Sequence, residues 1–124
     1  MKSFSKPKSQ ENAWLWSIKI VTGLLVLLLL FMHFQINHLS SPQGLMSYAD
    51  VVKYYQLPSI PETEIAFLIF VVSHALIGLR GIILDLQPKA GLIKAVNWLF
   101  PLAGLGAIVY GSWLVITIAG RGTL

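Results

Sequence analysis

Three long stretches of almost uninterrupted apolar residues alternate with polar segments along this chain of 124 residues. They run from about residue 14 to 34, from 65 to 86 and from 92 to 119. The hydrocarbon core of a bilayer takes roughly 20 apolar residues in helical form, so each stretch is long enough to cross it. The pattern therefore predicts an all-α integral membrane protein with three transmembrane helices, which form a single membrane domain over residues 1–124.

The polar segments between these spans differ in length, and the difference predicts how the spans are joined. Residues 35–63 are too many for a simple hairpin, and Ser47 followed by Asp50 resembles a capping box with Asp in place of Glu. We expect a short interfacial helix there that ends before Pro58 and lies along the membrane surface. Residues 87–91 form a short connection, which makes the second and third spans antiparallel neighbours.

The third span contains two features that bear on its packing. Ala103, Ala107 and Gly111 repeat every four residues, and such a ridge of small side chains permits close contact between helices. Pro101 lacks a backbone N–H and is expected to kink the helix.

Composition supports membrane insertion and limits the chemistry. Hydrophobic residues make up 56% of the chain and charged residues 11%. No cysteine is present, which excludes disulfides, thiolate zinc sites and cysteine-bound iron–sulfur clusters from this chain. Any metal must be held by histidine or carboxylate.

The positive charges predict the orientation of the spans. Seven of the nine lysines and arginines fall at one side of the three predicted spans and two at the other, so the N-terminus is expected in the cytoplasm and the C-terminus outside. The bases are spread over tails and loops, which argues against a nucleic-acid partner. The alternative interpretation of the first span as a cleaved signal peptide is weaker, because no small-residue cleavage site follows it. The seven basic residues on the predicted cytoplasmic side are Lys2, Lys6, Lys8, Lys19, Arg80, Lys89 and Lys94, and the two on the outer side are Lys53 and Arg121.

An ionisable residue stands roughly halfway along the second span. His74 is followed by Gly78, Gly81 and Asp85, which fall at about +40°, −20° and +20° from it around a helix. One face thus carries an imidazole, two bare backbone patches and a carboxylate. Histidine is an axial ligand of haem iron, glycines let a macrocycle approach closely, and ionisable residues in lipid are functional candidates. The alternative is a structural histidine hydrogen-bonded between helices.

The remaining candidates lie at other depths. His33 ends the first span near the outer edge, and His38 lies about 140° further round, so at most one of them is expected to be a ligand. The alternative for either is an interfacial histidine. Arg80 could reach a haem propionate or snorkel to phosphate headgroups of the membrane lipid. Three spans cannot enclose a macrocycle alone, so a partner is expected.

The second span also carries a resemblance. The run from His74 to Asp85 looks like the H-x3-G-x-R-x4-D signature of the small cytochrome b anchor subunits of succinate dehydrogenase and fumarate reductase (succinate:quinone oxidoreductase). The segment 14–33, with Lys19, Thr-Gly and a terminal histidine, resembles the first span of that family. Residues 46–58 resemble the connecting segment of the D-type anchor.

The resemblance implies a non-catalytic anchor subunit in a prokaryotic cell membrane. It would bind haem b together with a C-type anchor, and its other partners would be an iron–sulfur subunit and a flavoprotein subunit that oxidises succinate. His74 would be an axial ligand of haem iron, and His33 would correspond to the first-span histidine of the two-haem types. Asp85 would lie near the site where the family binds quinone. Lys19, about one turn inside the cytoplasmic boundary of the first span, is a second candidate for the quinone site.

The chain also departs from the family pattern. Leu86 stands where many members have a tyrosine that hydrogen-bonds quinone, Lys19 replaces an arginine, and no Ser-Pro-His element is present near the N-terminus, which argues against the C-type. Lys19 could simply snorkel. Two other functions remain open, a gamma-type cytochrome b subunit of another quinone-linked dehydrogenase and a haem-free structural anchor. The number of haems, one or two, and the type of quinone also remain open.

Overall fold

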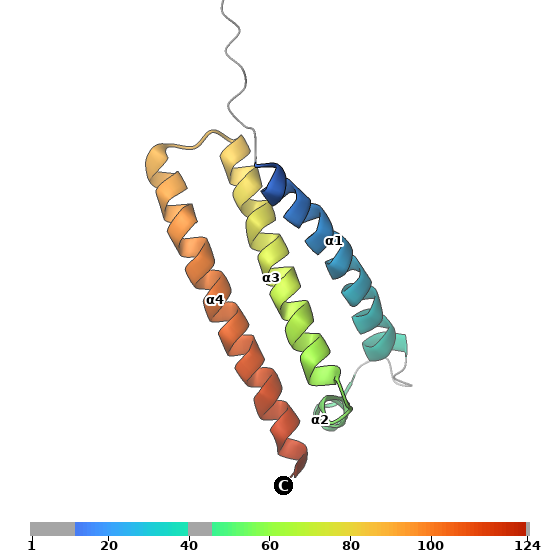
Figure 1. Cartoon of the computed structure of the whole chain (residues 1–124). Helices are drawn as coiled ribbons and strands as arrows, with labels where there is room; N and C mark the ends of the chain where they lie inside the picture. Colours follow the sequence, from blue (N-terminus) through green and yellow to red (C-terminus); the bar gives the residue numbers. More distant parts are fainter. Residues whose placement is uncertain (1–11, 40–45, 124) are drawn as a thin grey trace, which may run out of the picture.

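Four α-helices make up nearly all of the computed structural model, which describes residues 12–39 and 46–123. Three of them are long and apolar enough to cross a membrane, as the sequence predicted. The fourth is short and joins the first two spans (Figure 1). The helices are α1 (Ala13–Phe34), α2 (Tyr48–Tyr55), α3 (Ile60–Asp85) and α4 (Ala90–Gly120), with a π-helical turn at Gln35–Leu39 and a 3-10 turn at Arg121–Thr123.

The three long helices form one layer in which α3 lies between α1 and α4 (Figure 1). Within the described residues, α1 and α4 share no contact. We call the end where α1 begins and α3 meets α4 the loop end, and the opposite end, where α2 lies, the α2 end. The chain starts α1 at the loop end and completes α4 at the α2 end, as an odd number of spans requires.

The boundaries of α3 differ from the prediction at one end. The helix begins at Ile60, five residues before the predicted span, because its first turn is polar and was not counted in the apolar run. Ser59 is its N-cap and has a left-handed backbone with φ of 66°, which turns the chain sharply out of α2. Pro61 occupies the first turn, where its missing N–H costs no helical hydrogen bond.

The predicted capping box is confirmed at the start of α2. The Ser47 hydroxyl accepts from the backbone N–H of Asp50 (3.3 Å), and the Asp50 carboxylate accepts from the Ser47 backbone N–H (3.0 Å) and hydroxyl (2.7 Å). These bonds hold the pKa of Asp50 below its ordinary value. The helix is seen end-on in Figure 1, so it lies across the ends of the long helices. That orientation agrees with an interfacial helix.

Glycines bring α4 close to α3, but they are only partly those expected. A Cβ on Gly104 would lie 2.7 Å from Leu76 Cδ1, and one on Gly111 would overlap Leu68. Ala103 and Ala107 are exposed instead. Residues seven apart lie only about 20° from each other around a helix, whereas each four-residue step drifts about 40°, so the i, i+7 pair of glycines makes the contact. The helix continues through Pro101.

Candidate functional site

His74 lies in the contact between α3 and α1. Its Nδ1 is 3.2 Å from Thr22 Oγ1, and the ring is half-buried. A Cβ added to Gly23 would come within 3.1 Å of His74 Cε1, so the glycine gives the ring the space it occupies. The Thr-Gly pair resembles the first span of the family in sequence, but its contact with the histidine was not predicted.

The second ring nitrogen of His74 differs from Nδ1 in its surroundings. Nε2 makes no hydrogen bond to any residue that the structure describes, and no buried side-chain nitrogen or oxygen in the described chain lacks a partner. Nε2 therefore reaches the surface of the isolated chain. An imidazole held through Nδ1 with Nε2 accessible fits the role of a single axial ligand to haem iron.

The other members of the predicted histidine face lie toward the loop end of α3. A Cβ on Gly78 would meet nothing within 4 Å, so open space borders the helix one turn from His74. Gly81 is half-buried, and Asp85 is exposed at the last residue of the helix. Open space beside Gly78 leaves room for a flat group close to the backbone.

Lys19 lies on α1, three residues before Thr22, and is half-buried. The contacts Thr22–His74 and His33–Glu64 fix an antiparallel register, in which Lys19 lies level with Gly78. Asp85 is seven residues further along α3, about 10 Å at 1.5 Å per residue. The two residues expected near a quinone thus stand at different depths.

Arg80 faces a different neighbour from His74. Its Nε donates to Asn97 Oδ1 of α4 (2.9 Å), whereas His74 contacts α1. The arginine borders a groove of about 450 Å³ between α3 and α4 whose other lining residues, apart from Ser73 and Asn97, are apolar. The structure therefore does not bring Arg80 and His74 onto one surface, and contact between Arg80 and a propionate of a haem on His74 remains a prediction.

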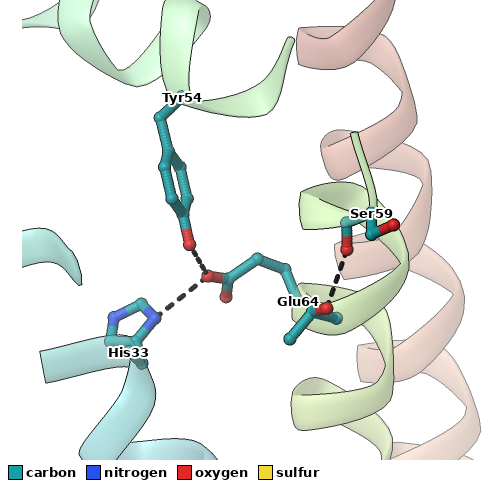
Figure 2. A network of polar contacts seen from close by, with 5 residues as sticks. His33, Tyr54, Ser59 and Glu64 are labelled. Atoms are coloured by element: carbon teal, nitrogen blue, oxygen red, sulfur yellow. Dashed lines mark hydrogen bonds and ion pairs between the residues drawn. The ribbon is translucent and has the colours of Figure 1, made fainter. Parts of the chain in front are cut away.

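His33 belongs to a polar network at the α2 end. Its Nδ1 is 3.1 Å from Glu64 Oε1, and the Tyr54 hydroxyl donates to the same oxygen at 2.5 Å (Figure 2). The ring also packs against Phe67, with centroids 5.5 Å apart. Glu64 is 10% exposed, so its carboxylate is held by partners from α1 and α2. Sequence reasoning missed Glu64 and Tyr54, although an acid at the edge of an apolar run was a usable signal.

His38 has different surroundings from His33. It lies in the π-helical turn after α1, is exposed, and packs against Phe34 with ring centroids 5.1 Å apart. Across the described residues, no three histidine, cysteine or acidic side chains gather in a way that could hold a metal ion. Lys2, Lys6 and Lys8, which entered the charge count, lie outside the described residues.

Comparison with known proteins identifies the family. The family described as "Succinate dehydrogenase/Fumarate reductase transmembrane subunit" matches residues 3–115. A curated protein of Archaeoglobus fulgidus, the "Succinate dehydrogenase hydrophobic membrane anchor subunit", is 36% identical over 120 residues, which cover 95% of this chain and all of that protein. The family match covers the first two spans and most of the third, so the chain belongs to the family of transmembrane subunits of succinate dehydrogenase and fumarate reductase.

Proposed function

We propose that this multi-pass membrane anchor is of the D-type and binds haem b together with a C-type anchor, with His74 as an axial ligand. The observation that carries the proposal is the state of the His74 ring, which is held through Nδ1 while Nε2 is accessible beside the open space at Gly78. Family membership supports a site of this kind in a complex with the catalytic subunits.

The need for a second anchor follows from the single layer of helices. In the described part of the chain, Tyr54, Val96 and Val115 are the only buried hydrophobic side chains, and large apolar side chains are exposed along every span. A tetrapyrrole in lipid requires protein on both of its faces, and a single layer of helices can cover only one of them. The partner anchor would supply the opposite face and the opposite axial ligand.

The chain's own residues would hold and orient the group. Haem b, when bound, supplies one-electron transfer. His74 Nε2 would bind the iron, and Gly78 and Gly81 would let the macrocycle lie close to α3. Further roles fall to Arg80, which would pair with a propionate if its guanidinium extends past Asn97, and to His33, which would serve an outer haem if the complex holds two.

The quinone site would lie at the loop end, where we place the cytoplasm. Asp85 is exposed there at the end of α3, so its carboxylate can hold or pass a proton to a quinone that takes two electrons and two protons. Lys19 would stand deeper on α1 and polarise the site. The iron–sulfur and flavoprotein subunits would dock on the same side, through the basic residues of the loop end.

One observation favours a second candidate function, a haem-free structural anchor. The contact between His74 and Thr22 joins two helices, which is what a structural histidine does. An absorption spectrum of the purified complex separates the candidates. We expect a b-type band that succinate reduces. A complex without any band after dithionite would refute the proposal and favour the structural anchor.

A further inference from the structure

The Thr22 hydroxyl on α1 contacts three groups. Oγ1 lies 2.7 Å from the backbone oxygen of Ile18, 3.2 Å from that of Lys19, and 3.2 Å from His74 Nδ1. A hydroxyl has one proton to donate and two lone pairs to accept with. The two backbone oxygens can only accept, and the nearer one lies at the shortest of the three distances. The proton of Thr22 is therefore directed to the carbonyl of its own helix.

This count of protons assigns the tautomer of His74. Because Thr22 offers the ring a lone pair, Nδ1 must carry the hydrogen that joins them. A neutral imidazole has one N–H, so Nε2 has the lone pair. That nitrogen is the one without a hydrogen bond among the described residues and the one that is accessible. The hydrogen bond to Thr22 thus leaves the ring in the form that binds a metal ion.

Gly23 fixes the position of the same ring. A Cβ at this residue would approach His74 Cε1 to 3.1 Å, Nδ1 to 3.6 Å and Nε2 to 3.8 Å. The first distance is tighter than nine in ten real Cβ contacts, so a side chain at this position would make the ring give by a few tenths of an ångström. The absence of a side chain at 23 and the hydroxyl at 22 therefore act on the ring from adjacent positions of one helix.

We infer that Thr22 and Gly23 are positioning residues which set the tautomer and orientation of His74, so that Nε2 presents its lone pair as an axial ligand. The inference rests on the proposed haem site. It follows a general property of metal-binding histidines, which donate their other N–H to an acceptor that fixes the ring. A hydroxyl is a neutral acceptor, so it leaves the ligand less basic than a carboxylate would.

The test compares variants of the full complex by haem content per complex and by the midpoint potential of the haem. Thr22→Val keeps the shape of the side chain and removes the acceptor, and loss of such a partner lowers metal affinity roughly 10- to 100-fold. We expect a haem loss of at least about tenfold at limiting haem, or a shifted potential in the haem that remains. Thr22→Ser retains the hydroxyl, so its haem content and midpoint potential should equal those of the wild type.

Thr117→Val is the matched control. Thr117 Oγ1 donates to the backbone oxygen of Trp113 at 2.8 Å, the same bond to its own helix that Thr22 makes, but it meets no histidine. Its haem content and potential should equal those of the wild type. If Thr22→Val also retains wild-type haem content and potential, the inference is overturned while the haem site stands. A wild-type complex without haem would instead refute the proposed function.

A second measurement does not depend on assembly of the variant. In the wild-type complex isolated from haem-depleted cells, the ¹⁵N chemical shifts of His74, assigned by their loss in His74→Ala, report which ring nitrogen is protonated. We expect protonated Nδ1 and bare Nε2. The opposite tautomer would overturn the inference.

Discussion

Two histidines join α1 to α3, and they differ in the acceptor that each Nδ1 meets. His74, at mid-depth, meets the neutral hydroxyl of Thr22, whereas His33, at the α2 end, meets the carboxylate of Glu64. Among the described residues, the hydroxyl contacts only its own helix and the ring. The carboxylate also accepts from Tyr54 and so links α1, α2 and α3.

The type of acceptor determines what each ring can do. The Thr22 hydroxyl holds the His74 ring through Nδ1 and leaves Nε2 without a hydrogen bond to any described residue, as a ligand requires. A carboxylate accepts a hydrogen bond from a ring N–H and fixes the orientation of the ring. The contact at His33 therefore fits either a structural bond between helices or a metal ligand whose other nitrogen is held by an acid. The prediction that His33 binds an outer haem therefore remains a prediction.

The largest expected effect comes from removing each histidine in turn. His74→Ala should abolish a b-type band in the purified complex, because the chain has no other imidazole at that depth. His33→Ala should leave that band in place. A dithionite-reduced spectrum measures both. Loss of about half the haem in His33→Ala would place a second haem at the α2 end, and an unchanged spectrum in His74→Ala would contradict the ligand assignment.

Exposed carboxylates lie near both ends of α3, and we expect only Asp85, at the loop end, to affect quinone reduction. Asp85→Asn removes a proton carrier at the loop end and should lower quinone reduction by succinate at least roughly tenfold, while dye reduction by succinate is retained. Glu62→Gln is the matched control, since this acid is also exposed and lies in the first turn of the same helix. Equal loss of both activities in Asp85→Asn would indicate an assembly defect and not a quinone site.

Substitutions at two glycines, Gly23 and Gly78, test the surroundings of His74. Alanine at Gly23 meets the imidazole, whereas alanine at Gly78 meets nothing within 4 Å of its Cβ in the chain alone. Gly23→Ala should therefore lower haem content several-fold. Gly78→Ala should leave the thermal stability of the haem-depleted complex unchanged and lower haem binding only where a macrocycle lies against α3. Wild-type haem affinity in Gly78→Ala would exclude close approach at that position.

A smaller effect is expected at the α2 end. Glu64→Leu removes the acceptor that Tyr54 and His33 both contact, and hydrogen bonds between membrane helices contribute about 1 kcal/mol each. We expect the stability of the complex to fall by about 2 kcal/mol for the two contacts, measured as loss of soluble complex on heating in detergent. Tyr54→Phe, which removes the contact of its hydroxyl with Glu64, should lose about half as much. The band that depends on His74 should persist in both variants.

The smallest effect concerns α2 and pH. Hydrogen bonds from the Ser47 hydroxyl, and then from its backbone N–H, lower the pKa of Asp50 from 3.8. A lowered pKa means that the stabilising contribution is complete above 3.8 and is lost as the pH falls through the folded-state value. Amide exchange at the start of α2 should therefore rise below about pH 4 relative to the α3 core. Asp50→Asn should weaken this pH dependence, and an unaltered profile would contradict the assignment.

The sequence predicted the spans because membrane insertion leaves few choices. A stretch of about 20 apolar residues has to be helical in lipid, where each backbone N–H and C=O needs a partner within its own segment. The capping box of Ser47 and Asp50 was equally visible, because it depends on residues three apart. Local signals of this kind carry over directly into the structure.

Contacts between helices were predicted less well, because they depend on register and rotation. The sequence places His74 on a face with Gly78 and Asp85, but nothing local to α3 reveals that Thr22 lies opposite. Arg80 likewise donates a hydrogen bond to Asn97 of α4, and the sequence of α3 alone does not reveal that Asn97 lies within reach. Such contacts depend on the register between antiparallel neighbouring helices. That register cannot be predicted from the pattern of apolar residues in one sequence.

A density map of the assembled complex, at a resolution that shows the His74 ring, would reveal whether this histidine binds haem. The account predicts a tetrapyrrole iron within bonding distance of Nε2, with Nδ1 still hydrogen-bonded to the Thr22 hydroxyl. A map in which Nε2 faces lipid or protein, with no tetrapyrrole at that depth of α3, would contradict it.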